Sequence, residues 1–179
     1  MNPCVIAISG RTGAGKSTIA RAVSTRLGWP RVSFGDYLRE AARNQMMQES
    51  RATLQELGES LVKQDAAGFT KALLSQVNFK SGVVVDGVRH MEILRALQNL
   101  VAPLPVHLIY VETDEPVRIQ RLIERGLTTD EIKTTDSHST EIQVSGLLRQ
   151  NAALRTRGDG ETSKTVDMIM EWLKFRQHG

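Results

Sequence analysis

The feature that most constrains this chain is a glycine-rich motif. Residues 10–17 read Gly-Arg-Thr-Gly-Ala-Gly-Lys-Ser, a complete G-x-x-x-x-G-K-[ST] pattern. The apolar run Val-Ile-Ala-Ile at 5–8 precedes the motif, and apolar residues at helical spacing follow it over 19–27. A strand, a tight turn and a helix in this order direct several backbone N–H groups at one point. The motif therefore predicts a phosphate-binding loop for a nucleoside triphosphate.

Each required residue of the motif has a role in holding phosphates. The glycines let the backbone wrap a polyphosphate, Lys16 reaches the outer phosphates, and the Ser17 hydroxyl can hold Mg²⁺. The sequence contains no Asn-Lys-x-Asp segment of the kind that reads a guanine base, so ATP is favoured as the nucleotide. We expect the nucleotide to contact Gly10, Arg11, Thr12, Gly13, Ala14, Gly15, Lys16, Ser17 and Thr18.

The length and composition indicate one globular domain. The chain has 179 residues, of which 40% are hydrophobic and 24% charged, as is ordinary for a globular protein with an ample core. Its 23 basic and 20 acidic residues nearly balance, which does not favour a nucleic-acid partner. No run approaches about 18 apolar residues, and the single cysteine, Cys4, cannot form an internal disulfide. We therefore expect a cytoplasmic protein with no membrane segment.

Short apolar runs alternate with segments of helical periodicity along the chain. The runs at 5–8, 83–85 and 106–111 are continuous, which is typical of strands buried on both faces of a parallel sheet. The alternation predicts an α/β fold in which helices cover both faces and the functional loops gather at the carboxyl ends of the strands. We expect strands at 3–9, 31–33, 82–86, 105–111 and 153–157, and helices at 16–27, across 36–78, at 90–100, 115–126 and 140–150, and at the C-terminus.

Two segments interrupt this alternation, the helical stretch 36–78 and the polar run 126–139. Thr, Ser and Asp dominate the polar run, which favours a mobile lid over a packed element. A plain surface loop is the alternative. We expect a single domain over 1–179 that contains both segments.

The strand predicted at 82–86 ends in an acid. Asp86 follows Val-Val-Val and precedes Gly87, at the sheet edge where the phosphate loop should also lie. A carboxylate at this place could bind Mg²⁺ through water or orient an acceptor group. A turn aspartate before glycine is the alternative interpretation.

Arginines provide the second chemical signal. Phosphoryl transfer spreads negative charge over several oxygens, so guanidinium groups from different elements are expected to converge. Arg121 and Arg125 are four residues apart and share one face of a predicted helix. The same helix is expected to turn Val117, Leu122 and Ile123 toward the core. Further arginines at suggestive positions are Arg39, Arg89, Arg149, Arg155 and Arg157.

Residues 32–40, Val-Ser-Phe-Gly-Asp-Tyr-Leu-Arg-Glu, resemble the acceptor-site signature of adenylate kinases and related nucleoside monophosphate kinases. The phosphate loop, the Val-Asp-Gly strand end at 85–87 and the segment 112–116 before the paired arginines occur in the family's order and approximate spacing. The resemblance implies a P-loop NTPase fold of three layers with a five-stranded parallel sheet. It also implies that the insert at about 36–78 binds the acceptor and that the lid lies at about 126–139.

The resemblance assigns roles on the donor side. Lys16 would neutralise charge on the transferring phosphoryl group, and Ser17 would ligate Mg²⁺, for which the strand-end position of Asp86 already indicates a second ligand. Arg121 would lie near the donor base and Arg125 near the phosphates. Catalysis would depend mainly on alignment and electrostatics. The catalytic set implied in this way is Lys16, Arg89, Arg121 and Arg125.

On the acceptor side the chain departs from the adenylate kinase pattern. Arg39 would hold the acceptor's phosphate with help from Arg89, but Phe34 stands where those kinases have a threonine. The family's Asp-Gly-Phe-Pro-Arg is Asp-Gly-Val-Arg at 86–89, a variant that looks more like archaeal-type P-loop kinases related to dephospho-coenzyme A kinases and somewhat like phage-type deoxynucleotide kinases. Residues 127–139 contain no lid arginine, and Arg149 is a candidate replacement. The expected acceptor-binding residues are Ser33, Phe34, Arg39, Asp86 and Arg89.

These observations favour an ATP-dependent, Mg²⁺-dependent kinase that transfers the γ-phosphoryl group to a nucleoside monophosphate or similar nucleotide. Phosphorylation of a hydroxyl, as in dephospho-coenzyme A kinases, is one alternative. A nucleotide-binding regulatory module without kinase turnover is the other, because the lid arginines are missing. The expected partner is a small-molecule nucleotide rather than a nucleic acid or a membrane, and the oligomeric state stays open.

Overall fold

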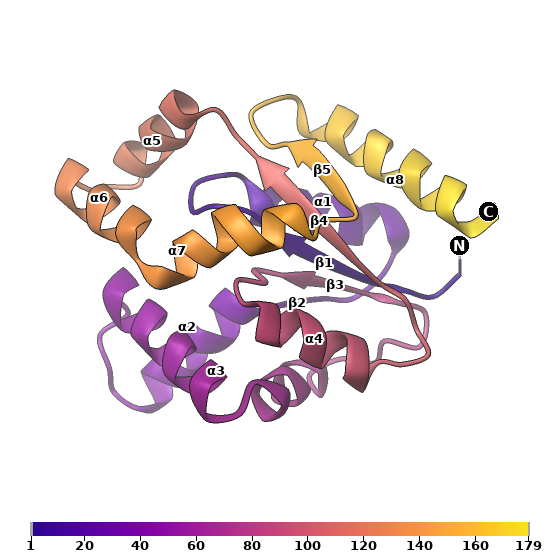
Figure 1. Cartoon of the computed structure of the whole chain (residues 1–179), viewed down its shortest axis with the longest axis horizontal. Coiled ribbons are helices and arrows are strands. Elements are labelled where there is room, and N and C mark those ends of the chain that lie inside the picture. The colour runs from indigo at the N-terminus through magenta and orange to yellow at the C-terminus, as the bar shows by residue number, and fades with distance from the viewer. Residues whose placement is uncertain (1, 179) are drawn as a thin grey trace.

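A five-stranded parallel sheet runs through the centre of the molecule (Figure 1). The computed structural model describes residues 2–178. The strand order is β2-β3-β1-β4-β5, so β1 lies in the middle, with Ile8 opposite Asp86 of β3 and Ile109 of β4. The predicted α/β fold with a five-stranded parallel sheet is confirmed. The strands are β1 (Val5–Ser9), β2 (Arg31–Ser33), β3 (Val83–Asp86), β4 (Val106–Glu112) and β5 (Leu154–Arg157).

Helices connect the strands and form the two outer layers. Figure 1 shows α2 and α3 together on one side of the molecule, where α5 and α6 also lie. The helices of the described residues are α1 (Lys16–Leu27), α2 (Phe34–Asn44), α3 (Arg51–Leu74), α4 (Met91–Leu100), α5 (Glu115–Glu124), α6 (Thr129–Ser137), α7 (Ser139–Gln143) and α8 (Thr162–His178), and a π-helix, η1 (Val144–Leu148), continues α7.

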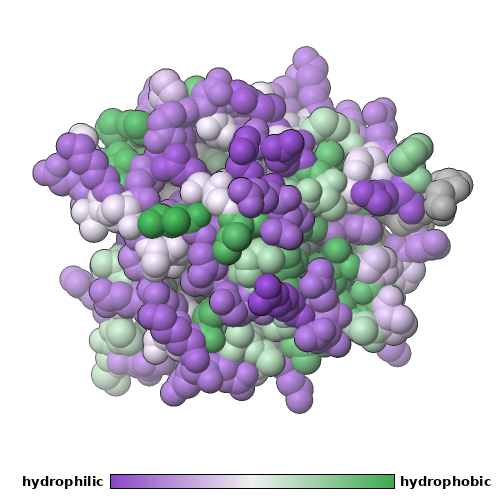
Figure 2. All heavy atoms as spheres, viewed as in Figure 1, coloured by the Kyte–Doolittle hydropathy of each residue, from purple (hydrophilic) through white to green (hydrophobic). Residues whose placement is uncertain are grey.

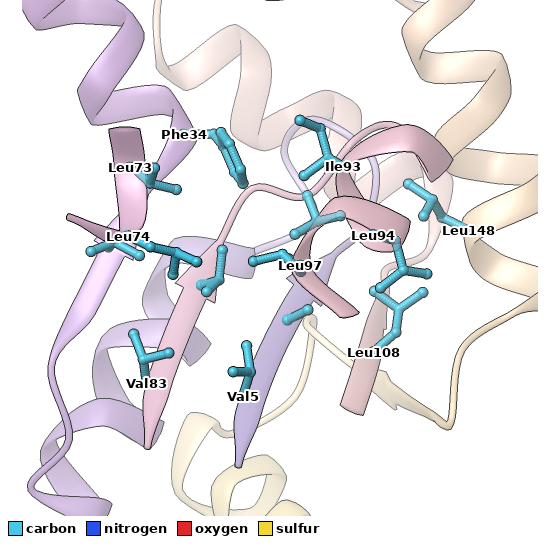
Figure 3. Close-up of a cluster of buried hydrophobic side chains, with 14 of the residues drawn as sticks. Val5, Phe34, Leu73, Leu74, Val83, Ile93, Leu94, Leu97, Leu108 and Leu148 are labelled. Carbon is cyan, nitrogen blue, oxygen red and sulfur yellow. The ribbon is translucent and has the colours of Figure 1, made fainter. Parts of the chain in front are cut away.

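Both faces of the sheet are buried, which explains why the strands read as continuous apolar runs. Val5 of β1 packs with Leu73 of α3 and Leu97 of α4 in one cluster of buried side chains (Figure 3). Ile6 points to the opposite face, where it packs in a second cluster with α1 and Ile169 of α8. Burial of each such side chain contributes about 1.5–3 kcal/mol, so both clusters stabilise the sheet.

The polar stretch without a predicted element contains a helix, α6. Thr128 accepts a hydrogen bond from the backbone N–H of Glu131, and the Glu131 carboxylate accepts one from the N–H of Thr128, which together form a capping box. Ile132 and Thr135 are buried on its inner face. The expectation of an unpacked segment here was wrong, because a Thr-x-x-Glu cap and one apolar residue per turn are enough to dock a short helix.

The face of α5 also differs from the prediction. Leu122 is fully buried, but Ile123 is 53% exposed, and the other buried residue of the helix is Arg118. The reason is that α5 packs closely against the phosphate loop. A Cβ added to Gly13 would lie only 3.0 Å from the side chain of Arg118 and 3.1 Å from that of Leu122. The buried face of α5 is therefore formed by Arg118 and Leu122, which are four residues apart.

The surface is largely hydrophilic on the face shown in Figure 2, with separate hydrophobic spots over α7 and η1. Exposed apolar side chains on this segment are Ile142 and Leu147. Within the described residues, no helix has the length and hydropathy needed to cross a membrane.

Candidate active site

The phosphate loop has a backbone that only glycine adopts readily. Gly10, Gly13 and Gly15 have φ angles of 146°, 85° and 89°. A Cβ on Gly10 would lie 2.4 Å from the carbonyl oxygen of Val111, so even alanine would displace β4 or the loop. The loop ends where α1 begins at Lys16, which gives the helix N-terminus expected for anion binding.

Lys16 lies across the loop in a buried position. Its ammonium group donates a hydrogen bond of 2.8 Å to the carbonyl oxygen of Arg11. Only 8% of the surface of Lys16 is exposed. Burial, together with the charge of Arg89, lowers the pKa of Lys16 to about 7. A phosphate beside the ammonium group would favour its charged form again.

Thr12, at the tip of the loop, is the centre of a polar cluster. Its backbone N–H and its hydroxyl donate hydrogen bonds of 3.2 and 2.7 Å to the carboxylate of Glu141 on α7. Arg89 donates to the same carboxylate and, at 2.8 Å, to the Thr12 hydroxyl oxygen. Arg51, the first residue of α3, also donates to that oxygen. The structure thus brings the predicted residues Thr12 and Arg89 together with two residues that the sequence analysis missed.

Glu141 is the buried acid of this cluster, with 1% of its surface exposed. Burial by itself would raise the pKa of Glu141, but the charges of Arg89 and Lys16 and the hydrogen bonds from Thr12 and Arg89 outweigh burial and lower it to about 2. Glu141 is therefore ionised at neutral pH. No local sequence pattern marks Glu141 as buried, since the run of polar residues before it is typical of an exposed segment.

A second group of charges clamps the phosphate loop to α5 and α6. The guanidinium of Arg118 donates to the carbonyl oxygen of Thr12 at 3.1 Å and pairs with Glu115 at 2.6 Å and Asp136 at 2.5 Å. Arg11 pairs with the same two carboxylates at 2.8 and 3.0 Å. Burial opposes the charge of Arg118, but the hydrogen bonds that it donates to both carboxylates raise its pKa above the ordinary value. Arg118 was missed because its position on α5 resembles an ordinary surface arginine.

Asp86 lies at the carboxyl end of β3, as predicted, and is almost fully buried. Its Oδ2 accepts a 2.6 Å hydrogen bond from Arg31, whereas Oδ1 has no hydrogen-bond partner among the described residues. Ser17 stands in the first turn of α1 with an exposed side chain. The described residues hold no cluster of three or more His, Cys, Asp or Glu side chains suited to a metal. The free Oδ1 and the Ser17 hydroxyl are oxygen donors of the type that Mg²⁺ takes alongside phosphates and water.

Three of the five predicted acceptor residues, Phe34, Arg39 and Arg89, line a cavity of about 310 Å³, whereas Ser33 and Asp86 are not part of its lining. Phe34 packs its ring against the edge of Phe69, at 5.1 Å between centroids, while lining this cavity. Ser33 uses its hydroxyl to cap α2 by accepting the N–H of Asp36, and Arg39 pairs with Asp36 at 2.7 Å. The cavity is lined by Phe34, Gly35, Leu38, Arg39, Glu49, Arg51, Leu54, Gln55, Gly58, Val62, Phe69, Gly87, Arg89, His90, Ile93 and Thr140.

Arg121 and Arg125 line a separate cavity of about 170 Å³ beside Gly15 and Thr18 of the loop. Arg121 donates a 2.8 Å hydrogen bond to the carbonyl oxygen of Gly158, in the turn after β5. Gly158 packs so closely on the phosphate loop that a Cβ there would lie 2.0 Å from the carbonyl oxygen of Ala14. The turn after β5 was not among the predicted site residues. A lone glycine in a polar turn gives no signal of this contact.

Arg149, the candidate replacement for the lid arginines, does not join the cluster at Thr12. It pairs with Glu112 at 2.8 Å. Arg51 reaches the tip of the phosphate loop instead, from the first residue of α3.

The family of the chain follows from comparison with known proteins. A model of the AAA domain family matches residues 9–143, which include the phosphate loop and Glu141. The chain belongs to this family.

Two curated relatives align with more than two thirds of this chain. The chain is 28% identical over 127 residues to the adenylate kinase of Listeria innocua, an alignment that covers 68% of this chain but only 59% of the relative. It is 27% identical over 152 residues to a UPF0200 protein of Aeropyrum pernix, covering 82% of this chain and 80% of the relative. These relatives confirm the predicted resemblance to P-loop nucleoside monophosphate kinases.

A solved structure shows the same fold. Shikimate kinase from Acinetobacter baumannii, in complex with shikimate, superposes with a TM-score of 0.68 over 98% of this chain and 95% of that protein, at 14% sequence identity. At this identity the likeness establishes the three-layer fold alone. The adenylate kinase relatives, not this likeness, support the prediction that the chain is an enzyme of the P-loop kinase class.

Proposed function

We propose that the protein transfers the γ-phosphoryl group of ATP to the phosphate of a nucleoside monophosphate or a similar nucleotide. The observation that carries this proposal is the arrangement of two cavities around one phosphate loop. One cavity reaches the loop at Gly15 and Thr18, and the other is lined by Arg51 and Arg89, which hold Thr12. A donor and an acceptor bound there would meet at the loop.

The donor would occupy the smaller cavity and the loop. Its phosphates would lie along 10–18, with Lys16 at the outer phosphates, Arg125 near them and Arg121 near the base. The Ser17 hydroxyl and the free Oδ1 of Asp86 would hold Mg²⁺, which shields the negative charge between donor and acceptor when it is bound.

The acceptor would occupy the larger cavity. Its volume of about 310 Å³ is at the lower end of the range for small-molecule sites, about 300–1,000 Å³, which suits one base and sugar. Phe34 offers an aromatic wall for a base, while Arg39 and Arg89 offer charges for a phosphate. We assign acceptor binding to the insert at about 36–78, because α2 and α3 supply most of this lining, and closure to the segment at about 126–139.

Turnover with a panel of acceptors tests the proposal. ADP formation is measured with ATP, Mg²⁺ and each of the common ribonucleoside and deoxyribonucleoside monophosphates, and with dephospho-coenzyme A. We expect at least one monophosphate to stimulate ADP release strongly and to yield the diphosphate by phosphorus NMR. A phosphorylated hydroxyl in the product would replace our proposal with the hydroxyl kinase. Tight nucleotide binding without stimulation by any acceptor would replace it with a regulatory module.

A further inference from the structure

Arg51 is a cation with no ion pair among the described residues, and it lies at the junction between the larger cavity and the tip of the phosphate loop. Its partly buried guanidinium extends from the first residue of α3 to the hydroxyl of Thr12 and lines the larger cavity. Its Nε is buried without a hydrogen-bond partner, and no ion pair involves Arg51 among the described side chains. A neutral hydroxyl offsets little of the desolvation of a guanidinium group.

The surrounding charges leave this junction strongly positive. Lys16, Arg51 and Arg89 interact electrostatically with one another, and Glu141 is the carboxylate in direct contact with the cluster. Burial and the charge of Arg89 lower the pKa of Arg51 to about 10, which reflects the cost of gathering these cations.

The other acids near the cluster are already paired. Asp86 accepts a hydrogen bond from Arg31 at 2.6 Å, and Asp136 pairs with Arg118 at 2.5 Å. The junction therefore has more positive than negative charge before any ligand binds. An anion that enters the cavity would find Arg51 unpaired.

Arg51 is better placed than Arg39 for an anion that reacts at the loop. The side chain of Arg39 is 49% exposed and paired with Asp36. Arg51, by contrast, contacts Thr12 directly and has no ion pair to break.

We propose that Arg51 binds the reactive phosphate of the acceptor together with Arg89, so that the acceptor enters as a phosphate anion rather than as a neutral hydroxyl. This proposal rests on the proposed function and deepens it by naming the group that selects the acceptor class. Arg51 would hold the attacking oxygen beside the loop, where electrostatic repulsion between two phosphates must be reduced.

The test is the kinetics of Arg51→Gln with the monophosphate that the wild-type protein turns over. Glutamine can still donate a hydrogen bond to Thr12 but carries no charge, so a merely structural role would be preserved. Loss of a hydrogen bond to a charged group corresponds to about a 10- to 100-fold change. We expect the acceptor KM to rise by about this factor, while the dissociation constant for ATP stays within about twofold of the wild-type value. Arg51→Lys should recover part of the loss.

Lys63→Gln is the matched control, because it removes one charge from an exposed position of the same helix. It should behave as wild type, and circular dichroism should show the same fold for all variants. An unchanged acceptor KM in Arg51→Gln would overturn the inference, although wild-type turnover of a monophosphate would still support the proposed function.

If no acceptor stimulates the wild-type protein, the proposed function fails and a binding measurement decides the inference. Inorganic phosphate is titrated calorimetrically into the protein saturated with ADP and Mg²⁺. Phosphate binding that Arg51→Gln weakens about tenfold or more would uphold the anion site. Absence of binding to the wild-type protein, or equal binding to the variant, would reject it.

Discussion

Replacing Glu141 with glutamine removes the negative charge from the cluster at Thr12 while keeping the size of the side chain. The pKa of Glu141 is lowered from 4.5 to about 2, and a change of this size corresponds to about 3 kcal/mol of stabilisation of the folded protein. Because the group is 1% exposed, solvent screening reduces this figure little. We therefore expect Glu141→Gln to lower the free energy of unfolding by about 3 kcal/mol at neutral pH.

The pH dependence of the free energy of unfolding tests whether the stabilisation comes from the ionised form of Glu141. A pKa lowered by folding contributes stability that is fully present above 4.5, the value in the unfolded chain, and is lost as the pH falls toward 2. Urea unfolding of the wild type and the variant should thus differ by a constant amount at neutral pH. The difference should shrink as the pH falls below 4.5.

Glu124→Gln is the matched control, because Glu124 is an exposed acid whose side chain contacts only Gln120 among the hydrogen bonds described. It should change the free energy of unfolding by less than about 0.5 kcal/mol. If Glu141→Gln has an equally small effect, or if its effect does not change with pH, the reasoning about the buried cluster is refuted.

Three further predictions concern the donor side. The pKa of Lys16 is lowered to about 7, so ATP binding at about pH 8 should take up a proton, measured by calorimetry in buffers of different ionisation enthalpy. Binding without proton uptake would contradict the role of Lys16. Gly158→Ala should destabilise the protein by about 1–3 kcal/mol and weaken ATP binding, whereas Gly146→Ala, where a Cβ meets open space away from the smaller cavity, should do neither. Asp86→Asn should raise the Mg²⁺ concentration for half-maximal rate by about tenfold, and an unchanged Mg²⁺ titration would remove Asp86 from the metal site.

Elements with a strong local signal were predictable. The runs 83–85 and 106–111 became the central strands β3 and β4 because residues buried on both faces must be apolar throughout. β5 was predictable only from its place in the alternation, since Leu-Arg-Thr-Arg is an edge strand with little apolar surface. Each of these strands was predictable because the signal for it lies in residues that are adjacent in the sequence.

The predictions for α6 and for the buried face of α5 were wrong, because the surfaces that these helices pack against are not visible in the sequence. The Thr-x-x-Glu cap of α6 was readable at 128–131, but the abundance of Thr, Ser and Asp outweighed it in the interpretation. The buried side of α5 could not be read from apolar residues, because its partner is a phosphate loop that needs Arg118. Polar residues buried by ion pairs look like surface residues in a sequence.

The sequence by itself determined the phosphate loop, because the loop is contiguous and its backbone geometry depends on glycines at fixed spacing. Only the tertiary structure decided the charged cluster at the tip of this loop. There Arg51, Arg89 and Glu141 reach Thr12 from positions 39, 77 and 129 residues away. Their charges affect one another only after folding removes water from between them, so no short pattern records their association.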